Sequence, residues 1–338
     1  MHQVLPARPD LSVIVVTHDG RELALAALQS ATQAVGDLVV EWHVVDSGST
    51  DGTPEAISRS WPSMALTRMG NVGFATASNV ALRTARGRYV LLLNPDVEII
   101  SGTFAALVRA LDSRPDVGLA SVVQLAPGGA LIPSICRDPS PARQLGEALG
   151  ASRLRLLRRL QEPRLDARAY DAEQSADWLL GALLIVRCET LAVVGGLDER
   201  FFLYSEETDW CRRVRDAGWD VRHLPLMTIV HHAGRSERPD LFAQRTHSKL
   251  LFARKHLSRG SRVAFRAALT VRHALRTAVF APVAAARPAR RARLQAEAAA
   301  LGIVLGLRGP SWSPSVRAGT ERTAIGHQAT AREDRGSV

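Results

Sequence analysis

The segment LSVIVVT, Leu11–Thr17, decides the fold class of this chain. Its apolar, mostly β-branched residues follow one another without alternation, which is typical of a strand buried on both faces of a parallel sheet. Two later segments, Glu41–Val45 and Tyr89–Leu93, have the same character and are predicted strands. The sequence therefore predicts an α/β fold with a mostly parallel central sheet flanked by helices.

Helical patterns separate these strands. We expect helices at Glu22–Ala34, Thr53–Ser60 and Ala75–Ala85, with a short strand at Leu66–Arg68. Strands that alternate with helices imply right-handed crossovers. Polar loops then lie at the carboxyl ends of the strands, where open α/β sheets bind ligands. Farther along, the patterns predict a strand at Val117–Gln124, ordered structure at Ala176–Arg187, a helix at Glu206–Ala217 and a strand at Asp220–Leu224.

The charge of the 338 residues is unevenly distributed. The net charge of +10 favours nucleic acid or an anionic membrane as a partner only if it is clustered. Residues 241–308 hold 14 Lys and Arg against a single acidic residue, whereas residues 1–240 are mildly acidic. We therefore expect an N-terminal extension at 1–10, a main domain at 11–240, a basic amphipathic helical appendage at 241–308 and a disordered tail at 309–338.

Three classes of protein are disfavoured by composition. Three cysteines are too few and too scattered for a disulfide framework or a zinc site. The longest apolar run, Trp178–Val186, has nine residues, less than half of a membrane span. The N-terminus has no apolar core of a signal peptide. We therefore expect a cytoplasmic protein.

Polar residues follow two of the predicted strands. The loop Asp46–Asp51 offers carboxylates, hydroxyls and glycine, which can bind a nucleobase or ribose, although the same residues are good helix N-caps. It contains no dinucleotide or Walker phosphate motif. Asn94-Pro95-Asp96 places a carboxylate where it could hold a divalent cation and so neutralise a leaving diphosphate; the alternative is a solvated turn.

An acidic cluster precedes the helix predicted at Glu206–Ala217. Glu206, Glu207 and Asp209 are three carboxylates within four residues. They could be a capping patch that favours the positive end of the helix dipole. They could also supply a general base, because close like charges raise the pKa of one carboxyl. The pair His231-His232 is either structural or a source of a metal ligand.

Six motifs in fixed order resemble the family 2 glycosyltransferases with the GT-A fold, especially the bacterial rhamnosyltransferase-like branch. They read VIVVTHDG, VVDSGSTDGT, NVGFATASNVALRTARGRYVLLLNPDVE, DWLLGALLIVR, GGLDERFFLYSEETDWCRRVRDAGW and HHAGRS, and together span about residues 11–236. The resemblance implies an enzyme that transfers a sugar with inversion. The favoured donor is dTDP-rhamnose, from which rhamnose would be transferred. A UDP- or GDP-sugar donor and a non-catalytic nucleotide-sugar-binding relative are the alternatives.

The resemblance also implies roles for individual residues. Glu207 corresponds to the expected base, with Glu206 and Asp209 as alternatives. Asp96 and His231 correspond to ligands of a divalent metal, Mg²⁺ or Mn²⁺; Asn94 stands where the family more often has a first aspartate. The positions near the nucleotide are Thr17, His18, Asp46, Ser49, Asn71, Gly73 and Asn94. The wall below the donor sugar and acceptor corresponds to Trp178, Leu180 and Gly181.

Two segments are expected to serve the acceptor. Residues 127–176 are read as an inserted, partly mobile segment facing a second substrate. In residues 241–308, apolar and basic residues interleave, as a helix lying on an anionic membrane requires. The alternative is a helix that packs on the main domain with a solvated arginine face. Nucleic acid is disfavoured because no recognition motif is present. A saccharide acceptor linked to polyprenyl diphosphate would explain both the main domain and the basic appendage. Such an acceptor implies cell-envelope glycan synthesis at the inner face of the cytoplasmic membrane.

Overall fold

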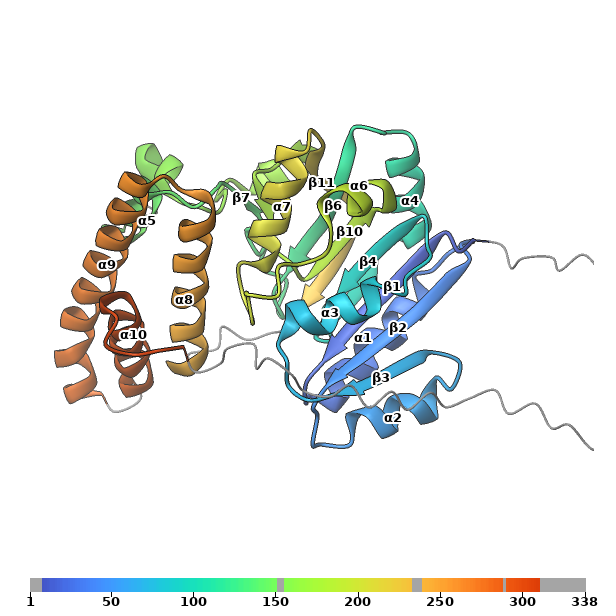
Figure 1. Cartoon of the computed structure of the whole chain (residues 1–338), viewed down its shortest axis with the longest axis horizontal. Coiled ribbons are helices and arrows are strands. Elements are labelled where there is room, and N and C mark those ends of the chain that lie inside the picture. Colours follow the sequence, from blue (N-terminus) through green and yellow to red (C-terminus); the bar gives the residue numbers. More distant parts are fainter. Residues whose placement is uncertain (1–7, 151–154, 233–238, 288–289, 311–338) are drawn as a thin grey trace, which may run out of the picture.

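The computed structural model describes residues 8–150, 155–232, 239–287 and 290–310 (Figure 1). Residues 311–338, which make up nearly all of the expected disordered tail, lie outside the described residues. So do residues 1–7 of the expected N-terminal extension and the AGRS portion of the last motif.

Within the described residues, nine strands form one mixed sheet in the order β3-β2-β1-β4-β10-β6-β11-β5, with β8 paired to β11. The strands β1, β2, β3 and β4 run parallel, as does the pair β6 and β11, whereas β10 is antiparallel to both of its neighbours. The prediction of a mostly parallel sheet is confirmed. The strands are β1 (Leu11–Thr17), β2 (Val40–Ser47), β3 (Ala65–Met69), β4 (Tyr89–Leu93), β5 (Val97–Ser101), β6 (Val117–Leu125), β8 (Gln174–Ser175), β10 (Leu183–Arg187) and β11 (Asp220–His231).

Both faces of the sheet are buried. All seven residues of β1 are buried. Val13 and Val15 pack in one apolar cluster with residues of α1 and α4, whereas Ile14 and Val16 pack on the other side with residues of α3 and α7. Each fully buried valine or isoleucine contributes about 1.5–3 kcal/mol, which explains why β1 has no polar face. The helices are α1 (Arg21–Gln33), α2 (Thr53–Ser60), α3 (Phe74–Leu82), α4 (Phe104–Asp112), α6 (Cys188–Val194) and α7 (Glu206–Asp216).

The strand register brings the polar loops together. Thr17 pairs with Asp46 at the carboxyl ends of β1 and β2, and Val15 pairs with Leu93 at the end of β4. The loops that follow these strands therefore leave the sheet at one edge, as expected for a parallel arrangement.

The segment 127–176 contains short elements in its described part. The strand β7 (Ile135–Cys136) pairs with β9 (Trp178–Leu179), which brings this segment to the edge of the site. Helix α5 (Pro141–Ala148) and the 3₁₀ helices η2 (Arg155–Leu160) and η3 (Ala167–Tyr170) follow. Figure 1 shows α5 on the side of the molecule where the C-terminal helices lie.

Three C-terminal helices form a bundle beside the sheet, namely α8 (Pro239–His256), α9 (Arg259–Ala286) and α10 (Arg291–Leu305). Figure 1 shows α8 on the side nearest α7. Phe252, Phe265, Leu269 and Val304 are buried. The expectation that the apolar residues of the appendage face a membrane is therefore wrong for these phenylalanines and for Leu269. Phe265 and Leu269 belong to the bundle's own core, and Phe252 is buried beside the ring of His256.

Several basic side chains of the bundle are also used internally. Lys255 pairs with Asp198 and Asp209, and Arg272 pairs with Glu147 of α5. The alternative interpretation, a helix packed on the main domain, thus describes α8. In the described residues, no helix combines the length and the apolar character that crossing a membrane requires.

Candidate active site

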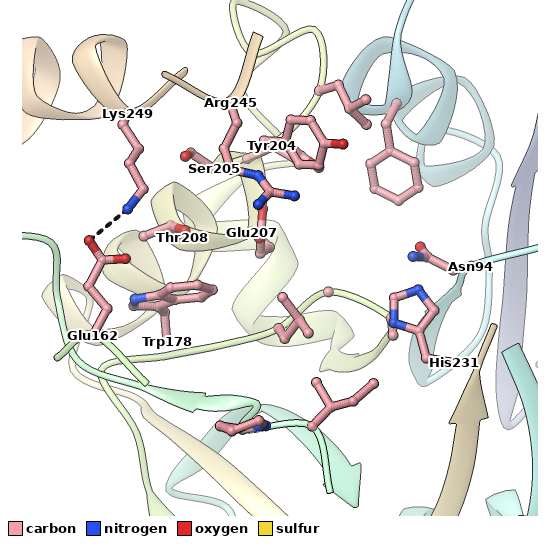
Figure 2. A pocket seen from close by; sticks show the side chains of 18 of the residues that line it. Asn94, Glu162, Trp178, Tyr204, Ser205, Glu207, Thr208, His231, Arg245 and Lys249 are labelled. Carbon is pink, nitrogen blue, oxygen red and sulfur yellow. Dashed lines mark hydrogen bonds and ion pairs between the residues drawn. The ribbon is translucent and has the colours of Figure 1, made fainter. Parts of the chain in front are cut away.

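A cavity of about 820 Å³ lies where β4, β11, α7 and the C-terminal bundle meet (Figure 2). One end is lined by Asn94, Asp96 and His231. Figure 2 shows Glu207 between that end and the opposite end, where Glu162 and Lys249 lie. Residues more than 150 positions apart in the chain therefore face one cavity.

Asp96 and His231 form a corner of the cavity. Asp96 follows β4, and His231 is the last residue of β11. Their Oδ1 and Nε2 atoms are 3.3 Å apart, and both atoms are buried without a hydrogen-bond partner. His232 instead places its Nε2 3.1 Å from the Oε2 atom of Glu98, so it has a structural partner.

These two side chains fit a divalent cation. One carboxylate oxygen and one imidazole nitrogen converge, and neither has a competing partner. No group of three or more His, Cys, Asp or Glu suitable for a metal occurs within the described part of the chain. A cation held here would take its other ligands from phosphate oxygens and water, as Mg²⁺ commonly does.

Glu207 lies in the first turn of α7 and lines the cavity. Its Oε2 atom is buried and has no hydrogen-bond partner. Burial raises the pKa of Glu207, and backbone hydrogen bonds and the charge of Arg245 act in the opposite direction. A β-carbon at Gly181 would lie 3.4 Å from the Cβ of Glu207, so the glycine leaves the space beside this carboxylate open.

The turn before α7 fixes the direction of this helix. Tyr204 and Ser205 both have left-handed backbone, with φ of 71° and 65°. Such angles are uncommon for non-glycine residues and persist where surrounding structure holds them. The turn points the first residues of α7 into the cavity.

Glu206 is the second carboxylate of this turn. It is buried, and its Oε2 atom has no hydrogen-bond partner. Burial, followed by the charge of neighbouring Glu207, raises the pKa of Glu206 well above its ordinary value. Two buried carboxyl groups so close favour a state in which only one is ionised.

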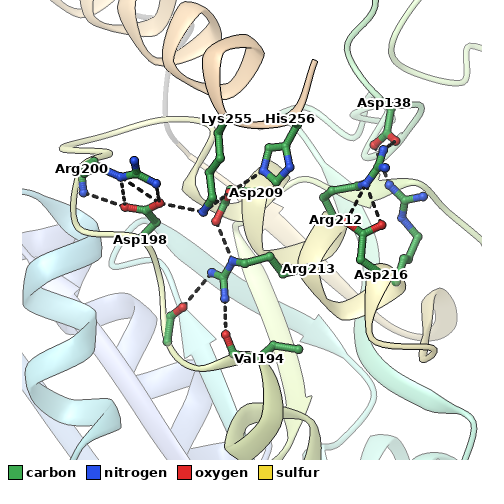
Figure 3. Close-up of polar contacts among 12 residues, drawn as sticks. Asp138, Val194, Asp198, Arg200, Asp209, Arg212, Arg213, Asp216, Lys255 and His256 are labelled. Carbon is green, nitrogen blue, oxygen red and sulfur yellow. Dashed lines mark hydrogen bonds and ion pairs between the residues drawn. The ribbon is translucent and has the colours of Figure 1, made fainter. Parts of the chain in front are cut away.

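Asp209 has a different environment, although it is only two residues from Glu207. It is fully buried and does not line the cavity. It accepts from Arg213 Nε at 2.8 Å, Lys255 Nζ at 2.6 Å and His256 Nε2 at 2.7 Å (Figure 3). Burial alone would raise the pKa of Asp209, but these partners bring it below its ordinary value. This carboxylate joins α7 to α8.

Residues expected at the nucleotide lie at the ends of β1 and β2 and on the loops near these ends. Thr17 and Asp46 are buried, and their Oγ1 and Oδ1 atoms lack hydrogen-bond partners. The Nδ1 atom of His18 is 2.8 Å from the carbonyl oxygen of Ser47, and its Nε2 atom is 3.4 Å from Nδ2 of Asn71. The ring is therefore positioned by two loops.

The loops on either side of the site are joined at Gly73. This residue has a φ of 84°, and a β-carbon there would lie 2.4 Å from the carbonyl oxygen of Phe202. The same oxygen accepts from the N–H of Phe74 at 2.8 Å. Ser49 accepts from the N–H of Asp19 at 2.8 Å. The nucleotide loops and the turn that carries Glu207 are thus held together.

The cavity brings together most of the residues expected at the donor sugar, metal and base. Trp178, with 9% of its surface exposed, lines the cavity and donates from Nε1 to the carbonyl of Arg137 at 2.9 Å. The expected residues that line the cavity are Asn94, Asp96, Trp178, Leu180, Gly181, Glu206, Glu207 and His231. Those that do not are Thr17, His18, Asp46, Ser49, Asn71, Gly73 and Asp209.

Sequence reasoning missed the side chains that the C-terminal bundle adds. Arg245 and Lys249 of α8 and Arg272 of α9 line the cavity. The four-residue spacing of Arg245 and Lys249 was the available signal, since it places both on one face of a helix. It was hidden among the other basic residues of the appendage.

The chain is similar to known proteins in both sequence and structure. The family model described as glycosyl transferase family 2 matches residues 12–132. A relative from Mycobacterium tuberculosis, N-acetylglucosaminyl-diphospho-decaprenol L-rhamnosyltransferase, is 31% identical over 79% of this chain and 94% of its own length. The rhamnosyltransferase WbbL of Escherichia coli K12 is 22% identical over 50% of this chain and 64% of its own.

The fold is also found among solved structures. The mannosyltransferase PcManGT from Pyrobaculum calidifontis, in complex with GDP-Man and Mn²⁺, superposes with a TM-score of 0.53. It is 19% identical, and the match covers 89% of this chain and 87% of that chain. At this identity the likeness concerns the fold.

Proposed function

The chain belongs to glycosyl transferase family 2 and is a glycosyltransferase, and we propose that it transfers rhamnose with inversion from dTDP-rhamnose to a polyprenyl-diphosphate-linked sugar. The observation that carries this proposal is the position of Glu207, which lines the cavity between the Asp96–His231 corner and the bundle and whose Oε2 atom has no hydrogen-bond partner. The name of the mycobacterial relative supports rhamnose as the transferred sugar and a diphosphate-linked N-acetylglucosamine as the acceptor.

The reaction proposed is a single displacement. Glu207 accepts the proton of the acceptor hydroxyl as its oxygen attacks the anomeric carbon of the donor sugar. The new C–O bond forms while the bond from that carbon to the phosphate oxygen breaks, and the electron pair leaves with the nucleoside diphosphate. Because attack and departure occur on opposite faces, the configuration inverts and no covalent enzyme intermediate is needed.

Asp96 and His231 are proposed to hold Mg²⁺ or Mn²⁺. Such a cation supplies positive charge against the negative charge of the leaving diphosphate. The Mn²⁺ and GDP-Man in the mannosyltransferase structure support this assignment. Thr17, His18, Asp46, Ser49, Asn71, Gly73 and Asn94 are proposed to contact the nucleotide part of the donor.

The metal proposal is tested by binding. We expect Mn²⁺ to bind the native protein in the presence of dTDP, and Asp96→Asn to weaken that binding at least tenfold, measured by titration calorimetry. The control is Asp116→Asn, far from the corner. Equal Mn²⁺ affinity of Asp96→Asn and the native protein, or full-rate transfer in excess EDTA, would overturn the assignment.

The function itself is tested with a panel of donors. dTDP-rhamnose, UDP-glucose, UDP-galactose and GDP-mannose are each incubated with short polyprenyl-diphosphate-linked N-acetylglucosamine. We expect the highest kcat/KM with dTDP-rhamnose and an inverted linkage in the product by NMR. A clear preference for a UDP- or GDP-sugar would select the alternative donor. Binding of a donor without transfer or hydrolysis would favour the non-catalytic alternative.

We also propose that the outer side of α9 contacts an anionic membrane. Val263, Val271, Leu275 and Val279 are 72%, 41%, 45% and 62% exposed. They recur in steps of eight, four and four residues, so they follow one side of the helix. Exposed alanines lie between them. The stripe is apolar although it faces solvent.

The charge around this stripe fits acidic lipid headgroups. Apart from Arg245, which lines the cavity, the exposed arginines of the bundle are Arg254, Arg259, Arg262, Arg266, Arg287, Arg290, Arg291 and Arg308. Between 239 and 310 the described acidic residues are Asp240 and the fully buried Glu297. An apolar helix face bordered by cations is the arrangement that binds the interface of an anionic membrane, where a lipid-linked acceptor resides.

A further inference from the structure

One face of α8 is turned toward the catalytic side chains. Arg245, Lys249, Phe252 and His256 are separated by four, three and four residues and so share one side of the helix. Lys249 pairs with Glu162 at 3.0 Å, and His256 pairs with Asp209 at 2.7 Å. Among the carboxylates of the described residues, none forms an ion pair with Arg245.

The guanidinium of Arg245 is positioned although it is exposed. It stacks over the ring of Tyr204, with 4.7 Å between the guanidinium carbon and the ring centroid. Figure 2 shows it beside Glu207, between the His231 corner and the Lys249–Glu162 pair. Tyr204 also lines the cavity. Arg245 thus presents a planar, pre-oriented cation to the cavity.

The other cations of the cavity wall are already neutralised. Lys249 faces Glu162, and Arg272 pairs with Glu147. Of the lysine and arginine residues in the described cavity lining, Arg245 is therefore the one that forms no ion pair with a described carboxylate, although its charge acts on Glu207 nearby. An arginine fork matches the oxygens of a phosphate, and its hydrogen bonds to an anion are among the strongest in proteins.

We propose that Arg245 binds a phosphate of the acceptor, the group that joins the acceptor sugar to its lipid. This rests on the proposed function, because it requires a diphosphate-linked acceptor. The acceptor hydroxyl must reach Glu207, and the Asp96–His231 corner serves the diphosphate of the donor. With a donor diphosphate at that corner, Arg245 is the unpaired cation of the described cavity lining that is left for the phosphate of the acceptor. Arg245 therefore makes the bundle part of the acceptor site.

The test compares Arg245→Gln and Arg245→Lys with the native enzyme. Two acceptors carry the same sugar, one as a short polyprenyl diphosphate and one as a neutral alkyl glycoside. For Arg245→Gln we expect the ratio of kcat/KM for the two acceptors to fall about 10–100-fold, as for loss of hydrogen bonds to a charged group. Arg245→Lys recovers part of this loss. The control Arg254→Gln, on the exposed side of α8, keeps the native ratio.

A second measurement does not depend on turnover. The Kd of the diphosphate-linked acceptor, measured without donor, is expected to rise in Arg245→Gln by a similar factor. The role of Arg245 is overturned if the Kd is unchanged or if kcat/KM falls equally with both acceptors. It is also overturned if the main effect is a higher KM for the donor, which would assign Arg245 to the donor diphosphate. Failure of the native enzyme to bind or use any diphosphate-linked acceptor would instead overturn the proposed function.

Discussion

Glu207 is the side chain on which the proposed chemistry depends. Glu207→Gln keeps the size and the hydrogen-bonding capacity of the side chain but cannot accept the acceptor proton. We expect kcat to fall by about 10²–10⁴-fold, the usual contribution of a general base, while the Kd for dTDP stays within about twofold. The measurement is transfer kinetics beside nucleotide binding, with Glu22→Gln, an exposed glutamate of α1, as the matched control. A fully active Glu207→Gln enzyme would remove Glu207 from the role.

Glu206 has a predictable effect on stability. Because its pKa is raised in the folded protein by burial and by Glu207, folding is favoured while this carboxyl is protonated. That stability is fully present below the ordinary carboxyl pKa and is lost as pH rises through the higher folded value. A tenfold difference in proton affinity corresponds to about 1.4 kcal/mol.

Glu206→Gln, which stays neutral, should therefore raise the Tm of the protein at pH 8. The gain should shrink as pH falls toward 4.5, the ordinary value for this side chain. Thermal unfolding from pH 4.5 to 8 measures it, with Glu22→Gln as the control. A Tm difference that is constant over this range, or that grows toward acid pH, would contradict the assignment of the raised pKa.

The sequence could locate the acidic cluster but not separate its members. Glu207 and Asp209 are two residues apart in one helical turn, so their surroundings depend on which side of α7 faces the cavity. Asp209 pairs with Lys255 and His256, which belong to a helix that begins 30 residues later in the chain. Only the packing of α8 on α7 distinguishes a buried ion pair from a carboxylate open to substrate.

Among the elements, α7 and α8 are joined mainly through Asp209. Removing one member of a buried ion-pair network leaves the others uncompensated, which typically costs about 3–5 kcal/mol. We expect Asp209→Asn to lower the free energy of unfolding by roughly 3 kcal/mol, measured by urea denaturation. In Asp216→Asn, on the same helix, an exposed pair with Arg212 is lost, and the expected change is below about 1 kcal/mol.

The outcome of that comparison bears on catalysis as well. If Asp209 acts only by fixing α7 against α8, Asp209→Asn should lose activity through a raised acceptor KM and a lower Tm. Loss of kcat with stability and KM unchanged would instead return Asp209 to the list of possible bases.

Strands with a long apolar run could be predicted, whereas elements that depend on distant partners could not. β1 and β4 have the bounds that the sequence predicts, because a strand buried on both faces consists almost entirely of apolar residues. β5 was not predicted: only Val97 of its five residues is buried, and it is held by pairing with β11, more than 120 residues later. The antiparallel β10 also depends on such pairing, with β4 and β6 on either side.

For the molecule as a whole, the net charge of +10 is a poor guide to how the C-terminal helices pack. Part of the positive charge is used inside the structure, where Lys249, Lys255, Arg272 and Arg276 meet carboxylates. A sequence pattern shows that apolar and basic residues interleave. It cannot show which turn of each helix packs inward, because that depends on three helices and α5 meeting at once.

What remains exposed on the bundle defines the membrane prediction. Fully burying a valine or leucine contributes about 1.5–3 kcal/mol, and each arginine near an anionic surface about 1 kcal/mol. The double variant Val271→Asp/Leu275→Asp should therefore reduce binding to vesicles containing 30% phosphatidylglycerol by at least tenfold in a flotation assay, and binding of the native protein should fall as salt rises. Val193→Asp, at an exposed valine of α6, is the matched control.

The same assay separates the possible occupants of the α9 stripe. A membrane contact requires anionic lipid, so the native protein should float with acidic vesicles and remain behind with phosphatidylcholine alone. A second copy of the chain would instead give a dimer in solution without lipid, abolished by Val271→Asp/Leu275→Asp, and equal flotation of native and variant proteins. That result would rule out a membrane contact for this face. It would not affect the roles proposed for Arg245 and Glu207, because the stripe and the cavity lie on different faces of the helices of the bundle.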